Sequence, residues 1–270
     1  MYLQRKGILH ARRMCARDHE MMLSFERGRW RCSKRECREE KGVRTGTWLE
    51  GSKLPIKKAV LFIYCWAHEL SSVKFCEREL DVGPHAVVDW SNYLREVCAA
   101  HLLQHPTVIG GPGMTVEIDE SLFVRRKNHH GRVLPQQWIF GGICRETGEN
   151  FAFCVPDRSS DTLLPIIRQS IRPGSLIVSD EWQGYNHVRQ HFNHDTVNHS
   201  YYFIDPATGA HTQNVERMWR TAKERNKRQS GTARHMLDSY MCEYMWRSRL
   251  HARDPFETVL QHIVDFWPPA

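Results

Sequence analysis

Three acidic residues have types and spacing that suit a metal-dependent reaction on phosphodiesters. Asp119 lies in an alternating segment, Asp180 ends a short apolar run, and Glu216 lies near the start of a helical stretch. Two Mg²⁺ ions about 4 Å apart need shared carboxylates, and they clamp the attacking and leaving oxygens of an in-line displacement. Mg²⁺ is a hard cation that is usually held by few carboxylates together with water and phosphate. The three residues therefore indicate a site for two Mg²⁺ or Mn²⁺ ions.

Each acidic residue has to be weighed against the ordinary case of a solvated surface group. Asp180 is less easily explained as a surface group, because it follows an apolar run that predicts a buried strand. Ligands bind beyond the carboxyl ends of such strands. Its sequence neighbour Glu181 is the main rival for this ligand position, and on an extended strand end it would point the other way. Glu181 and Glu224 are the competitors of Glu216.

The residues that flank these acids resemble the motifs of a known family. The chain is similar to the Merlin superfamily of DDE transposases and its bacterial insertion-sequence relatives in three ordered motifs, which are residues 116–121, residues 179–185, and residues 211–219 followed by Lys223. The resemblance covers residues 112–252 and, more loosely, the N-terminal third. It implies a ribonuclease H-like fold, catalytic metal ligands at Asp119, Asp180 and Glu216, and cut-and-paste DNA transposition.

Basic and amide side chains near the third acid are candidates for DNA contact. Lys223 lies two helical turns after Glu216, on the same helix face. A cation there could grip a phosphate beside the metal site, although basic helix faces are usually just solvated. We expect DNA contacts from Lys223, Arg220, Lys227, His211 and Asn214. The last of these could instead serve as a helix cap, a position that asparagine favours.

The amino-acid composition is typical of a basic globular protein. The 270 residues are 41% hydrophobic and 26% charged, with 38 Lys and Arg against 31 Asp and Glu. The net charge of +7 favours a polyanionic partner, though a basic globular protein without one remains an alternative. No apolar run approaches the ~20 residues that span a bilayer, and the N-terminus lacks the apolar core of a signal peptide. Nine scattered cysteines, an odd number, do not form a disulfide framework and favour a reducing compartment.

A helical segment is expected before the catalytic part of the chain. Apolar residues three to four apart predict a helix over residues 57–69, a second from a cap at Ser71 or Ser72 to Leu80, and a third over residues 84–103. Residues 53–109 then form a helix-turn-helix-like unit whose last helix could read the terminal inverted repeats of a transposon in the major groove. A plain helical bundle gives the same pattern.

From residue 112 onward the pattern changes to strands. Alternation predicts a strand around Asp119, followed by strands over residues 138–144 and 151–155. A helix over residues 159–171 leads into the strand that ends at Asp180, and further helices begin near residues 212, 236 and 255. This order predicts an α/β catalytic domain over residues 112–270, with a ribonuclease H-like mixed sheet flanked by helices.

Residues 1–52 contain two pairs of metal-type ligands. Cys15 and His19 form one pair and Cys32 and Cys37 the other, separated by a basic, hairpin-like stretch. Four Cys and His ligands suit tetrahedral Zn²⁺. Both spacings depart from the Cys-x2-Cys pairs of related transposases, so a zinc ribbon and a decayed ribbon with free thiols both stay open.

Three functions are compatible with these features. The first is an active DDE transposase, a metal-dependent endonuclease and polynucleotidyl transferase that cleaves double-stranded DNA at transposon ends and transfers the strands to target DNA. The alternative is a domesticated, transposase-derived DNA-binding protein that no longer cuts. A nuclease or resolvase unrelated to mobile elements is a third reading. We expect a homo-oligomer on DNA, no membrane partner, and a location in the nucleus if the source is eukaryotic or in the cytoplasm and nucleoid if it is bacterial.

Overall fold

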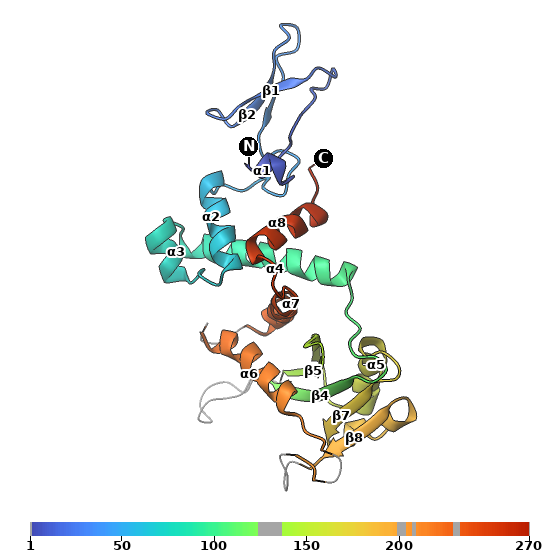
Figure 1. Ribbon diagram of the computed structural model, residues 1–270. Helices are drawn as coiled ribbons and strands as arrows, with labels where there is room; N and C mark the ends of the chain where they lie inside the picture. The colour runs from blue at the N-terminus through green and yellow to red at the C-terminus, as the bar shows by residue number, and fades with distance from the viewer. Residues whose placement is uncertain (1, 124–136, 199–203, 207–208, 229–232, 270) are drawn as a thin grey trace. The chain divides into compact units, whose positions relative to one another are not determined.

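The chain folds into two compact units (Figure 1). The computed structural model describes residues 2–123, 137–198, 204–206, 209–228 and 233–269. The first unit comprises Met1–His101 with Ala252–Ala270, and the second comprises Leu102–His251. Among the helices of the described residues, none combines the length and apolar character needed to cross a membrane.

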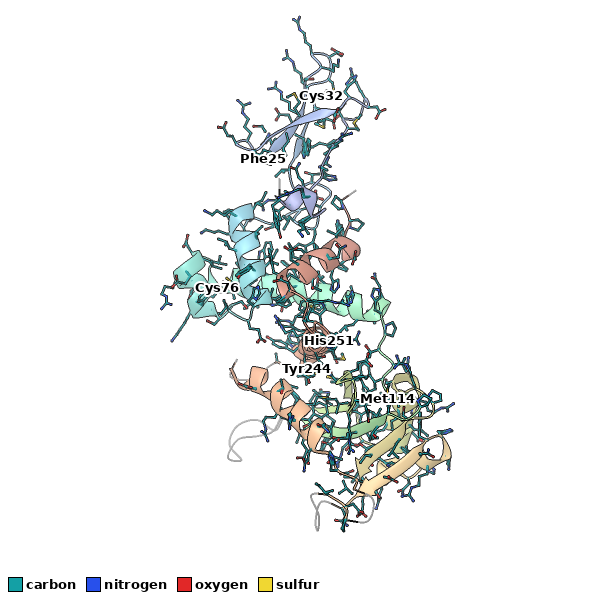
Figure 2. The ribbon with its side chains drawn as sticks, viewed as in Figure 1. Phe25, Cys32, Cys76, Met114, Tyr244 and His251 are labelled. Atoms are coloured by element: carbon teal, nitrogen blue, oxygen red, sulfur yellow. The ribbon has the colours of Figure 1, made fainter. Side chains whose placement is uncertain are left out.

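The first unit begins with a short helix, α1 (Tyr2–Arg5), and a small antiparallel sheet. Side chains of the middle strand alternate between two faces. Trp30 and Cys32 point into a buried cluster, and Arg29 and Arg31 are exposed. Figure 2 labels Cys32 in this sheet and Phe25 at the turn that follows the first strand. The strands lie in the order β1 (Met21–Ser24), β2 (Arg29–Cys32) and β3 (Glu40–Gly42).

Three helices follow the small sheet, close to the expected positions. Ser72 caps the second of them, because its hydroxyl accepts a hydrogen bond from the Phe75 backbone N–H at 3.3 Å. Asp81 ends that helix in a left-handed conformation with φ 49°, and Pro84 begins the next one, where its missing N–H costs nothing. The helices are α2 (Ile56–Ala67), α3 (Val73–Leu80) and α4 (Pro84–Gln104). Their use in reading DNA stays a prediction.

The second unit is built on a five-stranded mixed sheet. Its strands lie in the order β6 (Asn150–Val155), β5 (Trp138–Cys144), β4 (Thr115–Leu122), β7 (Leu176–Asp180) and β8 (Asn193–Val197). Strand β5 is antiparallel to both of its neighbours, β6 and β4, while β7 and β8 run parallel to β4. This strand order, with helices around the sheet, confirms the predicted ribonuclease H-like α/β fold. Strand β8 was not predicted from the sequence.

Helices cover the sheet of the second unit. The central strand β4 turns Val116 and Ile118 to one face and Glu117 and Asp119 to the other. The second face is covered by α6 (Gln213–Arg228), which contacts both β4 and β5, while α7 (Leu237–Ser248) packs on β6. Helix α5 (Ser160–Ser170) connects β6 to β7.

The C-terminal helix differs from the predicted domain boundaries. We expected residues 112–270 to form one catalytic domain, but α8 (Pro255–Phe266) is part of the first unit. The physical reason is its packing against α2, with ring contacts from Phe256 to Tyr2 and Tyr64. Asp254 caps this helix by accepting from the Glu257 N–H at 2.7 Å.

Candidate active site

Asp119 and Asp180 come from neighbouring parallel strands. Glu117 of β4 pairs with Val178 of β7, so two residues further along both strands Asp119 is level with Asp180. Paired residues of parallel strands project to the same face, and neighbouring strands are about 4.8 Å apart. The fold therefore brings together two carboxylates that are separated by 61 positions in the sequence.

Asp119 is held by the helix that covers its face. The indole Nε1 of Trp219 donates a hydrogen bond to Asp119 Oδ2 at 3.0 Å. Burial, and then the neighbouring negative charges of Glu120 and Asp180, raise the pKa of Asp119 to about 7. Burial likewise raises the pKa of Glu120 to about 7. A bound cation would relieve the repulsion among the carboxylates of Asp119, Glu120 and Asp180.

Asp180 is oriented by the turn that follows it. The backbone N–H of Trp182 donates to Asp180 Oδ1 at 3.0 Å. Its rival Glu181 is exposed and accepts a hydrogen bond from Asn198 Nδ2 at 2.5 Å. A cavity of about 230 Å³ lies beside Asp180, and its lining also includes Arg189 and His194.

Glu216 lies on α6, three residues before Trp219, so the two side chains occupy one side of the helix. Its side chain is exposed, and Thr212 Oγ1 lies 3.5 Å from Glu216 Oε1. Within the described part of the chain, one group of three or more His, Cys, Asp or Glu side chains is close enough to hold an ion, and it consists of Cys15, His19, Cys32 and Cys37. The carboxylates of Asp119, Asp180 and Glu216 do not form such a group, because they lie further apart.

A fourth carboxylate, which the sequence did not single out, anchors α6 to the sheet. Glu117 is fully buried. Its Oε2 accepts from the backbone N–H groups of Asn214 at 2.8 Å and Val215 at 3.0 Å. Arg145 Nε donates to Oε1 at 2.6 Å, which balances the buried charge. A negative charge at a helix N-terminus is favourable, so Glu117 fixes where α6 begins.

Two residues that we expected to contact DNA also lie at this anchor. Asn214 Nδ2 donates to Glu117 Oε1 at 2.7 Å, and His211 Nδ1 is 3.3 Å from the same oxygen. Their placement gives both residues a role in positioning α6. A direct contact with DNA stays a prediction for each.

The expected basic residues follow along α6. Arg220 is exposed, and Lys223 places its Nζ 5.5 Å from the ring centroid of Phe123, the residue directly after β4. Phe123 also packs edge-to-face on Trp219. The side chain of Lys227 lies outside the described part of the structure.

An arginine stack, also missed in the sequence, supports the turn after β7. The Arg158 guanidinium lies between two indoles, 4.1 Å from the Trp138 centroid and 4.0 Å from that of Trp182. Trp182 Nε1 donates to the Arg158 carbonyl oxygen at 3.0 Å. The same Trp182 donates its backbone N–H to Asp180, so the stack helps to set the orientation of that carboxylate.

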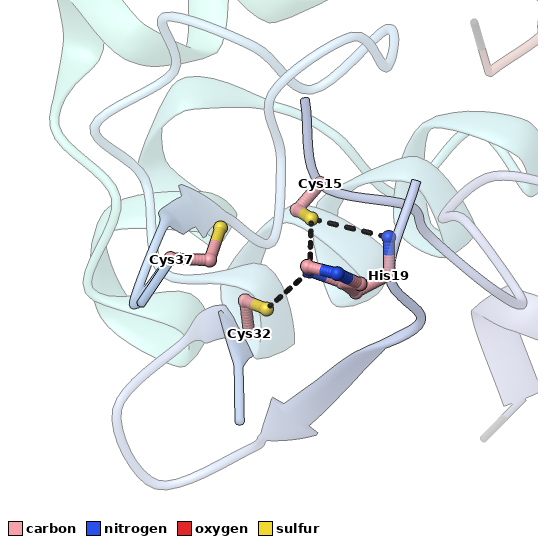
Figure 3. A group of neighbouring side chains, drawn as sticks. All are labelled: Cys15, His19, Cys32 and Cys37. Atoms are coloured by element: carbon pink, nitrogen blue, oxygen red, sulfur yellow. Dashed lines mark hydrogen bonds between the residues drawn. The ribbon is translucent and has the colours of Figure 1, made fainter. Parts of the chain in front are cut away.

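The predicted metal ligands of the first unit do come together (Figure 3). Single ligand atoms of Cys15, His19, Cys32 and Cys37 all lie within 4.8 Å of one another. His19 Nδ1 is 3.5 Å from Cys15 Sγ and 3.6 Å from Cys32 Sγ. Ligands bound tetrahedrally at about 2.0–2.3 Å from Zn²⁺ are about 3.3–3.8 Å apart. The group is therefore compatible with one Zn²⁺ ion.

The environment of Cys15 favours its metal-binding thiolate form. Burial acts to raise the pKa of the Cys15 thiol, but the backbone N–H groups of His19 and Arg17 and the nearby thiols outweigh it and lower the pKa to about 7. The His19 N–H donates to Cys15 Sγ at 3.2 Å. Such backbone donors also fix the direction of the sulfur.

Comparison with known proteins identifies the family of the second unit. The sequence profile of the ISXO2-like transposase domain matches residues 112–249, about half of the chain. An uncharacterized transposase-like protein of Haemophilus influenzae is 29% identical over 98 residues, which cover 36% of this chain and 78% of the relative.

Retroviral integrases are among the similar solved structures. The HTLV-2 integrase catalytic core, solved in complex with magnesium, has 13% identity and a TM-score of 0.31, covering 50% of this chain and 84% of the core. The BIV integrase core has 14% identity and a TM-score of 0.34, covering 54% and 93%. A simian T-cell lymphotropic virus intasome structure has 16% identity and a TM-score of 0.33, covering 67% of each chain. Because these scores are below 0.5, the fold assignment rests on the strand order.

Proposed function

The chain belongs to the ISXO2-like transposase domain family, and from this premise we propose that it cuts DNA at transposon ends and joins the freed ends to target DNA. Family membership confirms the resemblance to DDE transposases of bacterial insertion sequences. The reaction needs divalent ions, Mg²⁺ or Mn²⁺, and we assign their binding to Asp119, Asp180 and Glu216.

One observation carries this assignment. The register of β4 and β7, which pairs Glu117 with Val178, puts Asp119 and Asp180 two residues beyond that pair on adjacent parallel strands, and burial and like charge raise the pKa of Asp119 to about 7. A desolvated carboxylate beside a second negative charge is costly unless a cation or a proton compensates it. Oxygen ligands are what Mg²⁺ prefers, so a pair of this kind suits the proposed ions better than a purely structural role.

The chain's own residues each have a role in the proposed reaction. When bound, two Mg²⁺ ions would stabilise both the attacking and the leaving oxygen of the phosphodiester. Trp219 holds Asp119 at Oδ2, and Trp182 holds Asp180 at Oδ1, so both ligands are oriented before DNA arrives. Glu117 sets the start of α6, and that helix presents Glu216 and the basic residues that would grip phosphate.

The test compares two neighbouring carboxylates. The substrate is a supercoiled plasmid that carries the genomic DNA around the gene, incubated with Mg²⁺ or Mn²⁺. Asp180→Asn should abolish cleavage and keep DNA binding, since the amide is isosteric but removes a charged ligand. Glu181→Gln, at the exposed neighbouring position, is the matched control and should cut like the unaltered protein.

The outcomes separate the candidate functions. Cleavage by Asp180→Asn but not by Glu181→Gln would transfer the ligand role to Glu181. If the unaltered protein binds this plasmid but never cuts it, the alternative of a transposase-derived DNA-binding protein is favoured. Excision that leaves clean ends and needs inverted repeats would support transposition over an unrelated nuclease.

The partners follow from the same proposal. Terminal inverted repeats and target DNA would be the two DNA partners, and a homo-oligomer would hold two ends together. We assign one structural Zn²⁺ to Cys15, His19, Cys32 and Cys37, because His19 Nδ1 lies at tetrahedral ligand distances from two of the thiols and all four ligand atoms lie within 4.8 Å of one another. The protein would work where its DNA lies, the nucleoid of a bacterium or the nucleus of a eukaryote.

A further inference from the structure

Nearly all the net charge of the chain lies in its first part. Residues 1–52 contain thirteen Lys and Arg against seven Asp and Glu, so +6 of the overall +7 comes from this segment. We call this whole segment, residues 1–52, the ribbon; it includes the small sheet β1–β3. Phosphate neutralisation dominates non-specific affinity for DNA, so the charge favours the ribbon over the rest of the chain as a DNA-binding surface.

The outer face of the ribbon combines cations with apolar side chains. Register places Met22 beside Arg31, and Ser24 beside Arg29. Because the inward residues form the buried cluster, these side chains face out. Met22 is 71% exposed and Phe25 is 59% exposed. Phe25 lies at the turn between β1 and β2 (Figure 2). Large apolar side chains so exposed on a small, charged sheet suggest a contact surface.

The arginines of this face can exchange their ion pairs within the chain for ion pairs with a partner. Arg29 and Arg31 both pair with Glu40, at 3.1 Å and 3.6 Å, and their side chains are more than half exposed. Exposed ion pairs contribute little stability, so phosphate can replace Glu40 at low cost. Arg27 lies in the same turn as Phe25 and is also exposed.

We propose that the β1–β2 turn enters the minor groove of duplex DNA, where Phe25 wedges between base pairs and Arg27, Arg29 and Arg31 bind the flanking phosphates. Arginine in the minor groove, combined with an apolar wedge that partly unstacks a base step, is how many proteins bend DNA. Phe25 supplies the wedge and the ribbon's charge supplies the attraction. The inference rests on the proposed DNA partner but is independent of cleavage.

One feature of the turn opposes this binding and sharpens the test. Glu26 is exposed directly beside Phe25, and its charge would be repelled by phosphate. Glu26→Gln should therefore bind DNA more tightly than the unaltered protein and bend it to the same degree. A turn that docked on a basic protein instead would lose affinity with this change.

The experiment uses the zinc-loaded full chain and a short random-sequence duplex with a fluorophore at each end. Energy transfer between the fluorophores reports bending, and titration at several salt concentrations reports affinity. Phe25→Ala should abolish the bend and weaken binding about ten-fold, since the stacking of an aromatic ring on a base contributes to affinity. The salt slope should stay unchanged, because no charge is lost. Arg27→Ala should lower the slope by about one unit and keep the bend.

The matched control is Phe153→Ala, the same substitution at a 40% exposed position on β6, and it should change neither bend nor affinity. Unaltered protein that binds the duplex without bending it, or a Phe25→Ala variant that bends it normally, would overturn the wedge. A Phe25→Ala variant that changes oligomeric state while its DNA binding stays normal would also overturn it. Failure of the unaltered protein to bind any DNA would defeat the proposed function as well, whereas loss of cleavage alone leaves the wedge intact.

Discussion

Trp219 and Asp119 join the covering helix to the centre of the sheet through one hydrogen bond of 3.0 Å, from the indole Nε1 to Oδ2. The space for this indole comes from Gly141, which pairs with Asp119 across β4 and β5. A Cβ at Gly141 would lie 2.8 Å from the Trp219 ring, too close for any side chain without a shift of α6. Because Glu216 is on the same helix, this contact sets the candidate third ligand relative to the first.

Replacing Trp219 by phenylalanine should raise the Mg²⁺ concentration needed for cleavage by about ten-fold or more, because a hydrogen bond to a charged group contributes about 1.5–3 kcal/mol. The ring remains to fill its site, so the fold should persist. Plasmid nicking across a Mg²⁺ titration measures the effect. Trp246→Phe, at a buried position on α7, is the control, and an unchanged Mg²⁺ requirement for Trp219→Phe would contradict the role of the indole.

Asp119→Asn should stabilise the metal-free protein at about pH 8. The folded-state pKa of about 7 lies above the ordinary 3.8, so the proton-bound form favours folding. That stability is present below the unfolded pKa and is lost as pH rises through about 7. The variant should melt a few degrees higher than the unaltered protein at about pH 8, and the difference should narrow toward about pH 4.

Adding Mg²⁺ should reverse this order at about pH 8. The unaltered protein gains stability from an ion that binds only the folded state, whereas Asp119→Asn gains much less. Thermal melting with and without Mg²⁺ measures both effects. An Asp119→Asn variant that melts lower than the unaltered protein without metal would show that the carboxylate is stabilised by something other than an ion.

Freshly purified protein should contain about one Zn²⁺ per chain, and Cys32→Ser should remove it. The ribbon is too small to fold on its core alone, so metal binding supplies much of its folding free energy. Metal analysis together with circular dichroism checks the outcome. Cys154→Ser, on β6 of the other unit, should keep its zinc, and protein that purifies without zinc would favour free thiols.

Lys223→Ala should weaken binding to transposon-end and random DNA alike, and should lower the salt slope by about one unit. The reason is that a contact with phosphate carries no sequence information. Fluorescence titration of both duplexes over a range of salt measures it, with Arg168→Ala on α5 as a control that leaves the slope unchanged. Loss of end-specific binding alone would mean that Lys223 reads bases.

Much of the architecture could be predicted from the sequence because its signals are local. The apolar spacing of α2, the cap at Ser72 and the proline at the start of α4 lie within a few residues of the elements they define. The same holds for the alternation around Asp119. Ligand types in two short pairs were also enough to predict the Cys/His group, although its closure into one site required the ribbon to fold.

The tertiary structure decided the rest, because the partners are far apart in the chain. Strand β8 has little apolar alternation and is a strand because β7 offers it a hydrogen-bonding edge. Glu117 looks like any acidic strand residue until Arg145 and Val215, which are 28 and 98 positions away, bind its buried carboxylate. The sequence by itself determined which side chains could do the chemistry. Strand register and helix packing determined which of them meet, since those depend on burial shared between distant segments.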